Sequence, residues 1–263
     1  MIWEEVMKEI KHAMIQENRM IAPGMYSMTL QAEDIAKLAK PGQFVNLYCK
    51  GEARLLPRPI SICEINKEEG TINLIYAVVG KGTGEFSQLE EGDTVEVLGP
   101  LGNGFMIDEN KKKHIVVGGG VGTPPLLELV KHLKGEIDVY LGFRSYPILV
   151  EDFESLGARV HIATEDGSVD FKGNVLELMK KENANGDIIY ACGPKLMLKA
   201  VSEWAASNDI PMQVSLEERM ACGIGACVGC VCKTKKKEDK DWQHRKVCKD
   251  GPVFWHTEVI WDE

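Results

Sequence analysis

Hydrophobic and polar positions change their spacing twice along the chain and divide it into three parts. Up to about residue 105, short runs rich in β-branched and aromatic residues are separated by turns that contain Gly, Pro and acidic residues. Short strands spaced in this way are typical of an antiparallel barrel or sandwich. A short helix is expected to begin near Thr83 or Gly84. The runs that predict strands are residues 43–49, 59–65, 72–79 and 94–99.

From about Lys111, strand-like runs alternate with helical ones. This alternation predicts a doubly wound α/β domain with a parallel sheet. The apolar stretch at 114–117 leads through a glycine turn into the first helix. Further strands are expected at residues 138–145, 158–166, 187–194 and 211–217, and further helices at 175–183 and 195–208.

The last part of the chain, from Arg219 onward, is rich in Gly and Cys and poor in large aliphatic residues. A segment this short cannot build a sufficient core of its own, so a metal centre is expected to order it. The chain is therefore expected to form a barrel domain at residues 1–105, an α/β domain at 106–216 and a small metal-centre domain at 217–263.

Composition and charge exclude several classes of protein. Of the 263 residues, 44% are apolar and 27% are charged, as in ordinary globular proteins. The net charge is −9 and no arginine-rich stripe is present, so nucleic acid is not expected as a partner. No apolar run has the roughly 18–20 residues of a membrane span. The charged N-terminus lacks the apolar core of a signal peptide, so a cytoplasmic protein is expected.

Cysteine spacing is the strongest chemical signal in the sequence. Cys222, Cys227 and Cys230 form C-x4-C-x2-C, and Cys248 follows later. This is the spacing of plant-type [2Fe–2S] clusters, whose two irons need four converging thiolates. Zinc sites usually pair two cysteines twice, and here the second half has a single cysteine. Cys232 is left out of the ligand set because, in an extended segment, it would point away from Cys230.

Interleaved glycines support the cluster interpretation. Gly223, Gly225 and Gly229 allow the backbone to curl closely around the thiols and to turn amide N–H groups toward the sulfurs. Such donors help to set the reduction potential of a cluster.

A glycine turn after the first strand of the α/β part predicts a nicotinamide site. Glycines at this place let the backbone approach a pyrophosphate, and the following helix N-terminus favours negative charge. A Cys-Gly-Pro sequence ends the fourth strand of the α/β part, and ligands bind at the carboxyl ends of such strands. The residues expected at this site are Gly118, Gly119, Gly120, Gly122, Cys192, Gly193 and Pro194.

Two motifs in the barrel part predict a flavin site. An arginine at the start of a strand can pair with a pyrophosphate, and a serine hydroxyl can reach the flavin ring. A glycine-rich helix start offers further backbone N–H groups. The residues expected to bind FAD are Arg58, Pro59, Ile60, Ser61, Gly82 and Thr83.

These motifs, in this order, resemble the ferredoxin–NADP reductase superfamily. Ile60 stands where many members of that superfamily carry an aromatic residue, so aromatic stacking on the flavin is absent at that position. A closer resemblance covers essentially the whole chain. The sequences RPISI, ERMACGIGACVGC and VCKDGPVF are similar to those of the electron-transfer subunits of bacterial class B dihydroorotate dehydrogenases.

The resemblance implies a fold, cofactors and a partner. It implies an antiparallel FAD-binding barrel, a doubly wound nicotinamide domain and a small C-terminal iron–sulfur domain. It implies FAD contacts at Ile75, Tyr76 and Ala77, cluster ligation by the four cysteines named above, and Cys192 as the catalytic residue lining the nicotinamide crevice. The implied partner is an FMN-containing catalytic subunit in a heterotetramer with two subunits of each kind. Electrons would then pass from that subunit through [2Fe–2S] and FAD to NAD⁺ in pyrimidine biosynthesis.

Three alternatives stay open at the level of sequence. The same module serves other partners, as the small subunit of a ferredoxin-dependent NAD(P) transhydrogenase or of a sulfide dehydrogenase. A zinc-stapled nucleotide-binding protein without redox activity is a different class. The choice between NAD and NADP is also open, because Arg144 and Ser145 follow the second strand while Glu165 and Asp166 follow the third. The resemblance favours NAD.

Overall fold

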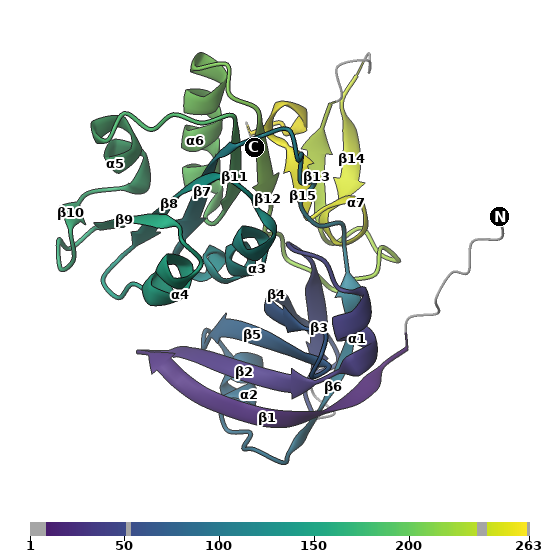
Figure 1. Cartoon of the computed structure of the whole chain (residues 1–263). Coiled ribbons are helices and arrows are strands. Elements are labelled where there is room, and N and C mark those ends of the chain that lie inside the picture. The colour runs from purple at the N-terminus through teal and green to yellow at the C-terminus, as the bar shows by residue number, and fades with distance from the viewer. Residues whose placement is uncertain (1–8, 51–53, 236–240, 262–263) are drawn as a thin grey trace.

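A computed structural model describes residues 9–50, 54–235 and 241–261 (Figure 1). Residues 1–8, which begin the charged N-terminal stretch and the expected barrel domain, lie outside the described residues. The barrel occupies one end of the molecule, the α/β sheet lies above it, and the C-terminal segment stands beside the sheet (Figure 1). Within the described residues, no helix has the length and hydropathy needed to span a bilayer.

Six antiparallel strands close the expected barrel. They are β1 (Lys11–Ala22), β2 (Met25–Gln31), β3 (Phe44–Tyr48), β4 (Arg58–Asn66), β5 (Thr71–Ala77) and β6 (Thr94–Leu101), in the order β1-β2-β5-β4-β3-β6. Side chains alternate across each strand, as the period of two requires. On β3, Val45 and Leu47 are buried inside the barrel, whereas Phe44 and Tyr48 pack outside it.

Two short helices belong to the barrel, α1 (Glu33–Leu38) and α2 (Lys81–Phe86). Helix α2 begins at Lys81, so the expected start near Thr83 or Gly84 is too late. The reason lies in Thr83, whose Oγ1 accepts hydrogen bonds from the backbone N–H groups of Val79 at 3.0 Å and Gly80 at 3.3 Å. Thr83, the third residue of α2, therefore accepts the backbone N–H groups just before the helix and caps its start.

A seven-stranded sheet forms the α/β part and confirms the doubly wound architecture. Its strands are β7 (Lys113–Gly119), β8 (Glu136–Phe143), β9 (Arg159–Thr164), β10 (Phe171–Lys172), β11 (Ile188–Cys192), β12 (Met212–Ser215) and β15 (Val253–Trp255), in the order β10-β9-β8-β7-β11-β12-β15. Every pairing is parallel except that of β12 with β15. The order reverses between β7 and β11, and this switch point is where such folds bind ligands.

Helices cover both faces of the sheet. They are α3 (Pro124–His132), α4 (Val150–Ser155), α5 (Val175–Lys181) and α6 (Lys195–Ser207), with the 3-10 turn η1 (Gly120–Gly122) before α3. Leu126 of α3 and Phe153 of α4 pack in one apolar core, whereas Leu178 of α5 and Leu198 of α6 pack in another. Each helix thus buries its apolar stripe against the sheet.

The cysteine-rich segment shares its core with both other parts, although the sequence indicated that a metal centre would order it. It contains β13 (Val231–Thr234), β14 (Gln243–Lys246), α7 (Val247–Asp250), β15 and the 3-10 turn η2 (His256–Glu258). One apolar core joins residues of all three parts: Phe44, Leu98 and Leu101 of the barrel, Val214 within β12 and Leu216 just after it, and Cys230, Val247, Cys248 and Phe254 of the segment. Strand β15 also completes the sheet by pairing with β12.

Glu128 links the α/β part to the barrel. Its side chain is 5% exposed, and its Oε2 accepts a hydrogen bond from the backbone N–H of Ile65 on β4 at 2.9 Å. Its Oε1 lies 3.0 Å from Nε2 of His132. A buried carboxylate with these partners ties α3 to the strand that carries the predicted flavin motif.

Replacing Glu128 by Leu should lower the free energy of unfolding by about 1–3 kcal/mol, because the partly buried N–H of Ile65 loses its acceptor. Thermal or urea unfolding measures the change. Glu151→Leu is the matched control, since Glu151 is an exposed carboxylate on the facing helix α4. Equal stability of both variants would contradict the role of Glu128.

Candidate functional site

The four cysteines predicted to bind a cluster all accept N–H···S hydrogen bonds from the backbone. The N–H of Cys227 donates to the Sγ of Cys222 at 3.4 Å, and the N–H of Gly229 donates to Cys227 at 3.4 Å. The N–H of Gly225 donates to Cys248 at 3.1 Å, and the N–H of Cys248 donates to Cys230 at 3.5 Å. Each of the four sulfurs therefore accepts at least one backbone N–H, which is the environment that stabilises thiolate ligands.

Two glycines give the loop its shape. Gly223 has φ of 67° and Gly225 has φ of 82°, in the left-handed region that other residues rarely adopt. A Cβ on Gly225 would also lie 2.7 Å from the side chain of Lys249. The loop can therefore turn its amides inward only with glycine at these positions.

The thiols differ in acidity. Burial raises the pKa of Cys222, but hydrogen bonds from the backbone of Cys227 and Ile224 outweigh it and lower the pKa to about 6. Burial raises the pKa of Cys248 to about 12, and the neighbouring Cys230 adds to the rise. Because cluster ligands must be thiolates, binding iron would release the proton of Cys248.

The donor set fits an iron–sulfur cluster in kind, since four cysteines surround one short loop and receive amide donors. Among the residues that the structure describes, no group of three or more Cys, His, Asp or Glu side chains has the geometry to hold one metal ion. Cys232 packs in the same apolar core as Cys230 and Cys248. It lines a small cavity of about 40 Å³ together with Gly193, Glu217 and Trp261.

The predicted nicotinamide residues meet at the switch point of the sheet. Gly118 at the end of β7 is in register with Cys192 at the end of β11. A Cβ on Gly122 would lie 2.6 Å from the backbone of Cys192, and one on Gly119 would lie 2.8 Å from Pro194. The structure thus brings the glycine turn and the Cys-Gly-Pro sequence into backbone contact at the carboxyl ends of the strands.

Gly120 and Gly193 have a different reason to be glycine. Gly120 has φ of 52°, and a Cβ there would meet nothing within 4 Å. Gly193 has φ of 153°, and a Cβ there would lie 3.0 Å from the Cα of Gly119. Gly120 is therefore required for its backbone conformation, and Gly193 also for the close approach of two chains.

Cys192 is a buried, neutral thiol. It is 2% exposed. Burial raises its pKa to about 12, the charge of Glu217 adds to the rise, and a hydrogen bond with Ser215 opposes it. Cys192 stays protonated at neutral pH and offers neither a nucleophile nor a proton carrier there.

The predicted flavin residues gather where β4 meets helix α2. The guanidinium of Arg58 packs directly over Gly82, where any side chain would collide with it. In the pairing of β3 with β4, Pro59 is opposite Asn46 and Ser61 is opposite Phe44. Partners in register point to the same face, so Pro59 and Ser61 lie on the outer face of the barrel, whereas Ile60 packs toward the barrel core.

The three residues carried over on β5 point in different directions. Tyr76 is 1% exposed inside the barrel, and its hydroxyl donates to Oδ1 of Asn18 at 3.2 Å. Ile75 is 4% exposed and packs with the core of the α/β part. Ala77 is half-buried at the strand end. Tyr76 can therefore offer FAD only its backbone.

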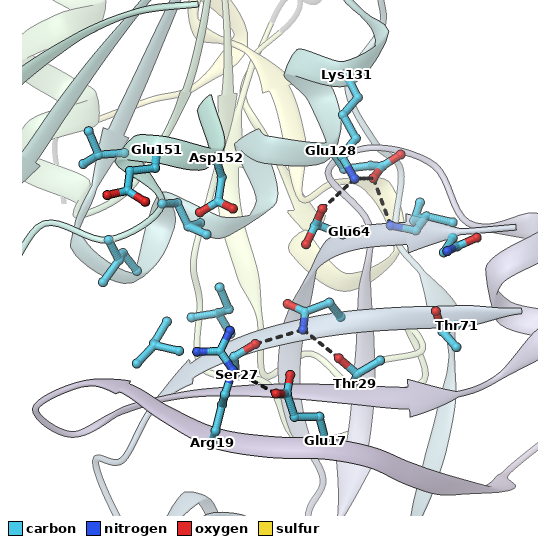
Figure 2. Close-up of a pocket in the computed structure, with 18 of the residues that line it drawn as sticks. Glu17, Arg19, Ser27, Thr29, Glu64, Thr71, Glu128, Lys131, Glu151 and Asp152 are labelled. Atoms are coloured by element: carbon cyan, nitrogen blue, oxygen red, sulfur yellow. Dashed lines mark hydrogen bonds and ion pairs between the residues drawn. The ribbon is translucent and has the colours of Figure 1, made fainter. Parts of the chain in front are cut away.

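A polar cleft of about 960 Å³ lies between the outer face of the barrel and helices α3 and α4 (Figure 2). Charges of both signs line it, among them Glu17, Arg19 and Lys131. Ile75 is the one predicted site residue in its lining. The cleft therefore contacts the predicted flavin residues only through Ile75, and neither the cysteine loop nor the glycine turn lines it.

Sequence reasoning missed two barrel asparagines that hold the cysteine-rich segment. Nδ2 of Asn46 donates to the carbonyl of Cys222 at 3.1 Å, and Nδ2 of Asn103 donates to the carbonyl of Lys249 at 2.9 Å. The sequence does hold one indication of the role of Asn46, since this polar residue interrupts the apolar strand sequence FVNLY. Asn103 lies outside the strands and carries no comparable signal.

Comparisons with known proteins agree with this geometry. A family model described as the iron-sulfur cluster binding domain of dihydroorotate dehydrogenase B matches residues 217–260, and one described as the oxidoreductase FAD-binding domain matches residues 14–105. The chain is 46% identical to a dihydroorotate dehydrogenase B (NAD(+)) electron transfer subunit from Caldanaerobacter subterraneus subsp. tengcongensis, over 94% of this chain and 97% of that protein. It is 41% identical to the subunit of the same name from Bacillus caldolyticus, over 94% of this chain and 96% of that protein.

Solved structures extend the comparison. The structure of an NADH-dependent reduced ferredoxin-NADP oxidoreductase aligns with a TM-score of 0.85 and 33% identity, over 95% of this chain and 90% of that chain. The cytochrome b5 reductase domain of Ulva prolifera nitrate reductase aligns with a TM-score of 0.60 and 19% identity, over 73% of this chain and 89% of that chain. The second likeness shows a shared fold alone.

The fold and these matches define an NAD-linked oxidoreductase subunit with an FAD-binding barrel and an iron–sulfur segment. Relatives at 41–46% identity cover nearly the whole chain, and they carry one name. The chain belongs to the family of electron transfer subunits of dihydroorotate dehydrogenase B (NAD(+)).

Replacing Gly122 by Ala should slow flavin reduction by NADH roughly tenfold or more, because the new Cβ displaces the backbone of Cys192 and misplaces the crevice. Gly157→Ala is the matched control, since Gly157 is not among the predicted nicotinamide residues, has φ of 81° and would place a Cβ in open space, at a cost of only about 1–2 kcal/mol of backbone strain. Stopped-flow absorbance of the flavin measures both. Similar rates for the two variants would show that the turn does not shape the site.

Replacing Cys230 by Ser should remove the cluster absorbance and bound iron while FAD remains, because one of four ligands is lost. Cys232→Ser should keep the cluster. Both cysteines are buried, at 1% and 9% exposure, so packing changes are comparable. Iron analysis with visible spectroscopy measures the outcome, and a cluster that survives in Cys230→Ser would remove Cys230 from the ligand set.

Proposed function

We propose that this chain carries electrons from an FMN-containing dihydroorotate dehydrogenase catalytic subunit to NAD⁺. The proposed cluster ligands are Cys222, Cys227, Cys230 and Cys248. The observation that carries this proposal is that each of those four thiols accepts a backbone N–H···S hydrogen bond, in a segment packed against β3 and β6 of the barrel. A bound flavin takes up two electrons as hydride and releases them singly, and a [2Fe–2S] cluster carries one.

The barrel supplies the proposed FAD site. Arg58 stands ready to pair with the pyrophosphate beside the first turn of α2, where Gly82 allows the close approach. Ser61 on the outer face can bond the ring, whereas Tyr76 contributes its backbone alone. The full proposed set is Arg58, Pro59, Ile60, Ser61, Ile75, Tyr76, Ala77, Gly82 and Thr83.

The switch point of the sheet supplies the proposed nicotinamide site. Gly118, Gly119, Gly120 and Gly122 offer backbone before the N-terminus of α3, a place that favours a pyrophosphate. Cys192, Gly193 and Pro194 form the other side of the crevice. The Cys192 thiol, held neutral by burial, shapes the crevice without exchanging a proton.

NAD is the proposed nicotinamide. Hydrogen bonds from Ser168 and Ser145 hold the pKa of Asp166 below its usual range, so this exposed carboxylate is charged. The backbone N–H of Asp166 donates to the carbonyl of Arg144 at 3.2 Å, which keeps the charge beside the end of β8. A fixed negative charge there disfavours the 2′-phosphate of NADP.

The proposed partner assembly is a heterotetramer with two subunits of each kind, in the cytoplasm. The relatives are named electron transfer subunits, which supports a separate catalytic partner. Ile224 and Val228 on the cysteine loop are 50% and 73% exposed, which suits contact with another protein near the cluster. The proposed domains are an FAD-binding domain at residues 1–105, a nicotinamide-binding domain at 106–216 and a cluster-binding domain at 217–263.

The experiment compares the anaerobically purified chain with and without a co-expressed dihydroorotate dehydrogenase catalytic subunit. NADH alone should bleach the flavin and cluster absorbance of the chain. Dihydroorotate should bleach them only when the partner is present. Bleaching by NADH but never by dihydroorotate would contradict the proposed partner and favour a ferredoxin-linked role, as in the 33% identical oxidoreductase. A colourless protein that contains zinc would contradict the whole proposal.

A further inference from the structure

The outer face of β3 is the surface on which the cysteine-rich segment rests. Phe44 on this face packs in the same core as Cys230 and Cys248, and Tyr48 packs against that core. Asn46 lies between them and is 0% exposed. It is therefore a polar side chain enclosed between the barrel and the segment.

The side chain of Asn46 contacts the loop at the first proposed cluster ligand. Its Nδ2 donates to the carbonyl of Cys222 at 3.1 Å. A Cβ on the next residue, Gly223, would lie 2.8 Å from the Cγ of Asn46. The loop backbone and the asparagine amide thus fit against each other without room for a further side chain.

Stability does not explain an asparagine at this place. Oδ1 of Asn46 is buried and has no hydrogen-bond partner among the described residues, and such an orphaned acceptor destabilises a fold. An apolar side chain of similar size would pack beside Phe44 and Leu98 without an orphaned oxygen. The hydrogen bond to Cys222 is the contact that only a polar side chain can make.

A second barrel asparagine holds the other end of the segment. Nδ2 of Asn103 donates to the carbonyl of Lys249 at 2.9 Å, one residue after Cys248. The backbone N–H of Asn103 donates to the carbonyl of Gly251 at 2.6 Å. The first proposed ligand, Cys222, is therefore fixed to the barrel through its own carbonyl. The fourth, Cys248, is fixed through the carbonyl of the next residue, Lys249.

We propose that Asn46 and Asn103 are positioning residues that fix the cluster-bearing loop relative to the flavin strands. Asn46 is opposite Pro59 in the β3–β4 pairing, so the residue that holds Cys222 sits on the same outer face as the flavin motif. The two asparagines thereby set where the cluster stands with respect to FAD. This inference rests on the proposed ligation by Cys222 and Cys248.

The test compares Asn46→Ala and Asn103→Ala with Asn73→Ala in the full chain holding FAD and cluster. Asn73 is the matched control, because its Nδ2 donates to Ser27 at 2.9 Å and to Thr29 at 3.1 Å, on strands that do not hold the cysteine loop. Two readouts are recorded: the rate at which EDTA bleaches the cluster, and the EPR g values of the dithionite-reduced cluster.

Loss of one anchoring hydrogen bond should open the loop about fivefold more often and speed bleaching by about the same factor. Asn46→Ala should also shift the g values, which a purely stabilising contact would not do, while Asn73→Ala keeps both readouts unchanged. Asn103 is exposed, so its variant decides the matter if Asn46→Ala does not fold.

Unchanged bleaching in Asn103→Ala, together with unchanged bleaching and g values in any folded Asn46→Ala protein, would overturn the inference and leave the proposed function intact. An unsubstituted chain that binds FAD but no cluster would overturn the proposed function, and this inference with it.

Discussion

Strand β15 pairs antiparallel with β12, and this pairing places the cysteine-rich segment between the nicotinamide sheet and the barrel. The segment cannot fold around a core of its own, so its cysteines join an apolar core to which the barrel and the sheet also contribute. Since the segment contacts both, it fixes the barrel and the sheet relative to each other. The proposed flavin, nicotinamide and cluster sites therefore lie on parts of the chain that pack against one another.

Backbone groups perform most of the binding chemistry in this arrangement. Amide N–H groups reach all four thiols of the cysteine loop, and the glycine turn meets the end of β11 through backbone alone. Side chains act chiefly as supports: Glu128 ties α3 to β4, and Asn46 ties β3 to the loop. A module that only moves electrons needs fixed distances more than it needs acids and bases, and the neutral thiol of Cys192 agrees with that requirement.

Local patterns predicted much of this molecule. The strands β3 to β6 and the alternation from β7 to β12 follow from apolar runs and turn residues, and the cysteine spacing alone indicated a cluster. Strand β1 was not among the predicted strands, because only Ala13 and Ile15 of its twelve residues are buried and the alternation is weak. Strand β15 has three residues, and only its distant partner β12 defines it. The anchoring role of Asn46 likewise depends on a contact with a residue 176 positions away.

We propose that NADH reduces a cluster held by the cysteine-rich segment, through FAD bound to the barrel. Low-temperature EPR of the purified chain, frozen after anaerobic addition of NADH, tests it most directly. We expect the signal of a reduced [2Fe–2S] cluster in protein that holds FAD, and none in protein from which FAD has been removed. A bleached flavin without any cluster signal, or a cluster reduced by NADH equally well without FAD, would contradict it.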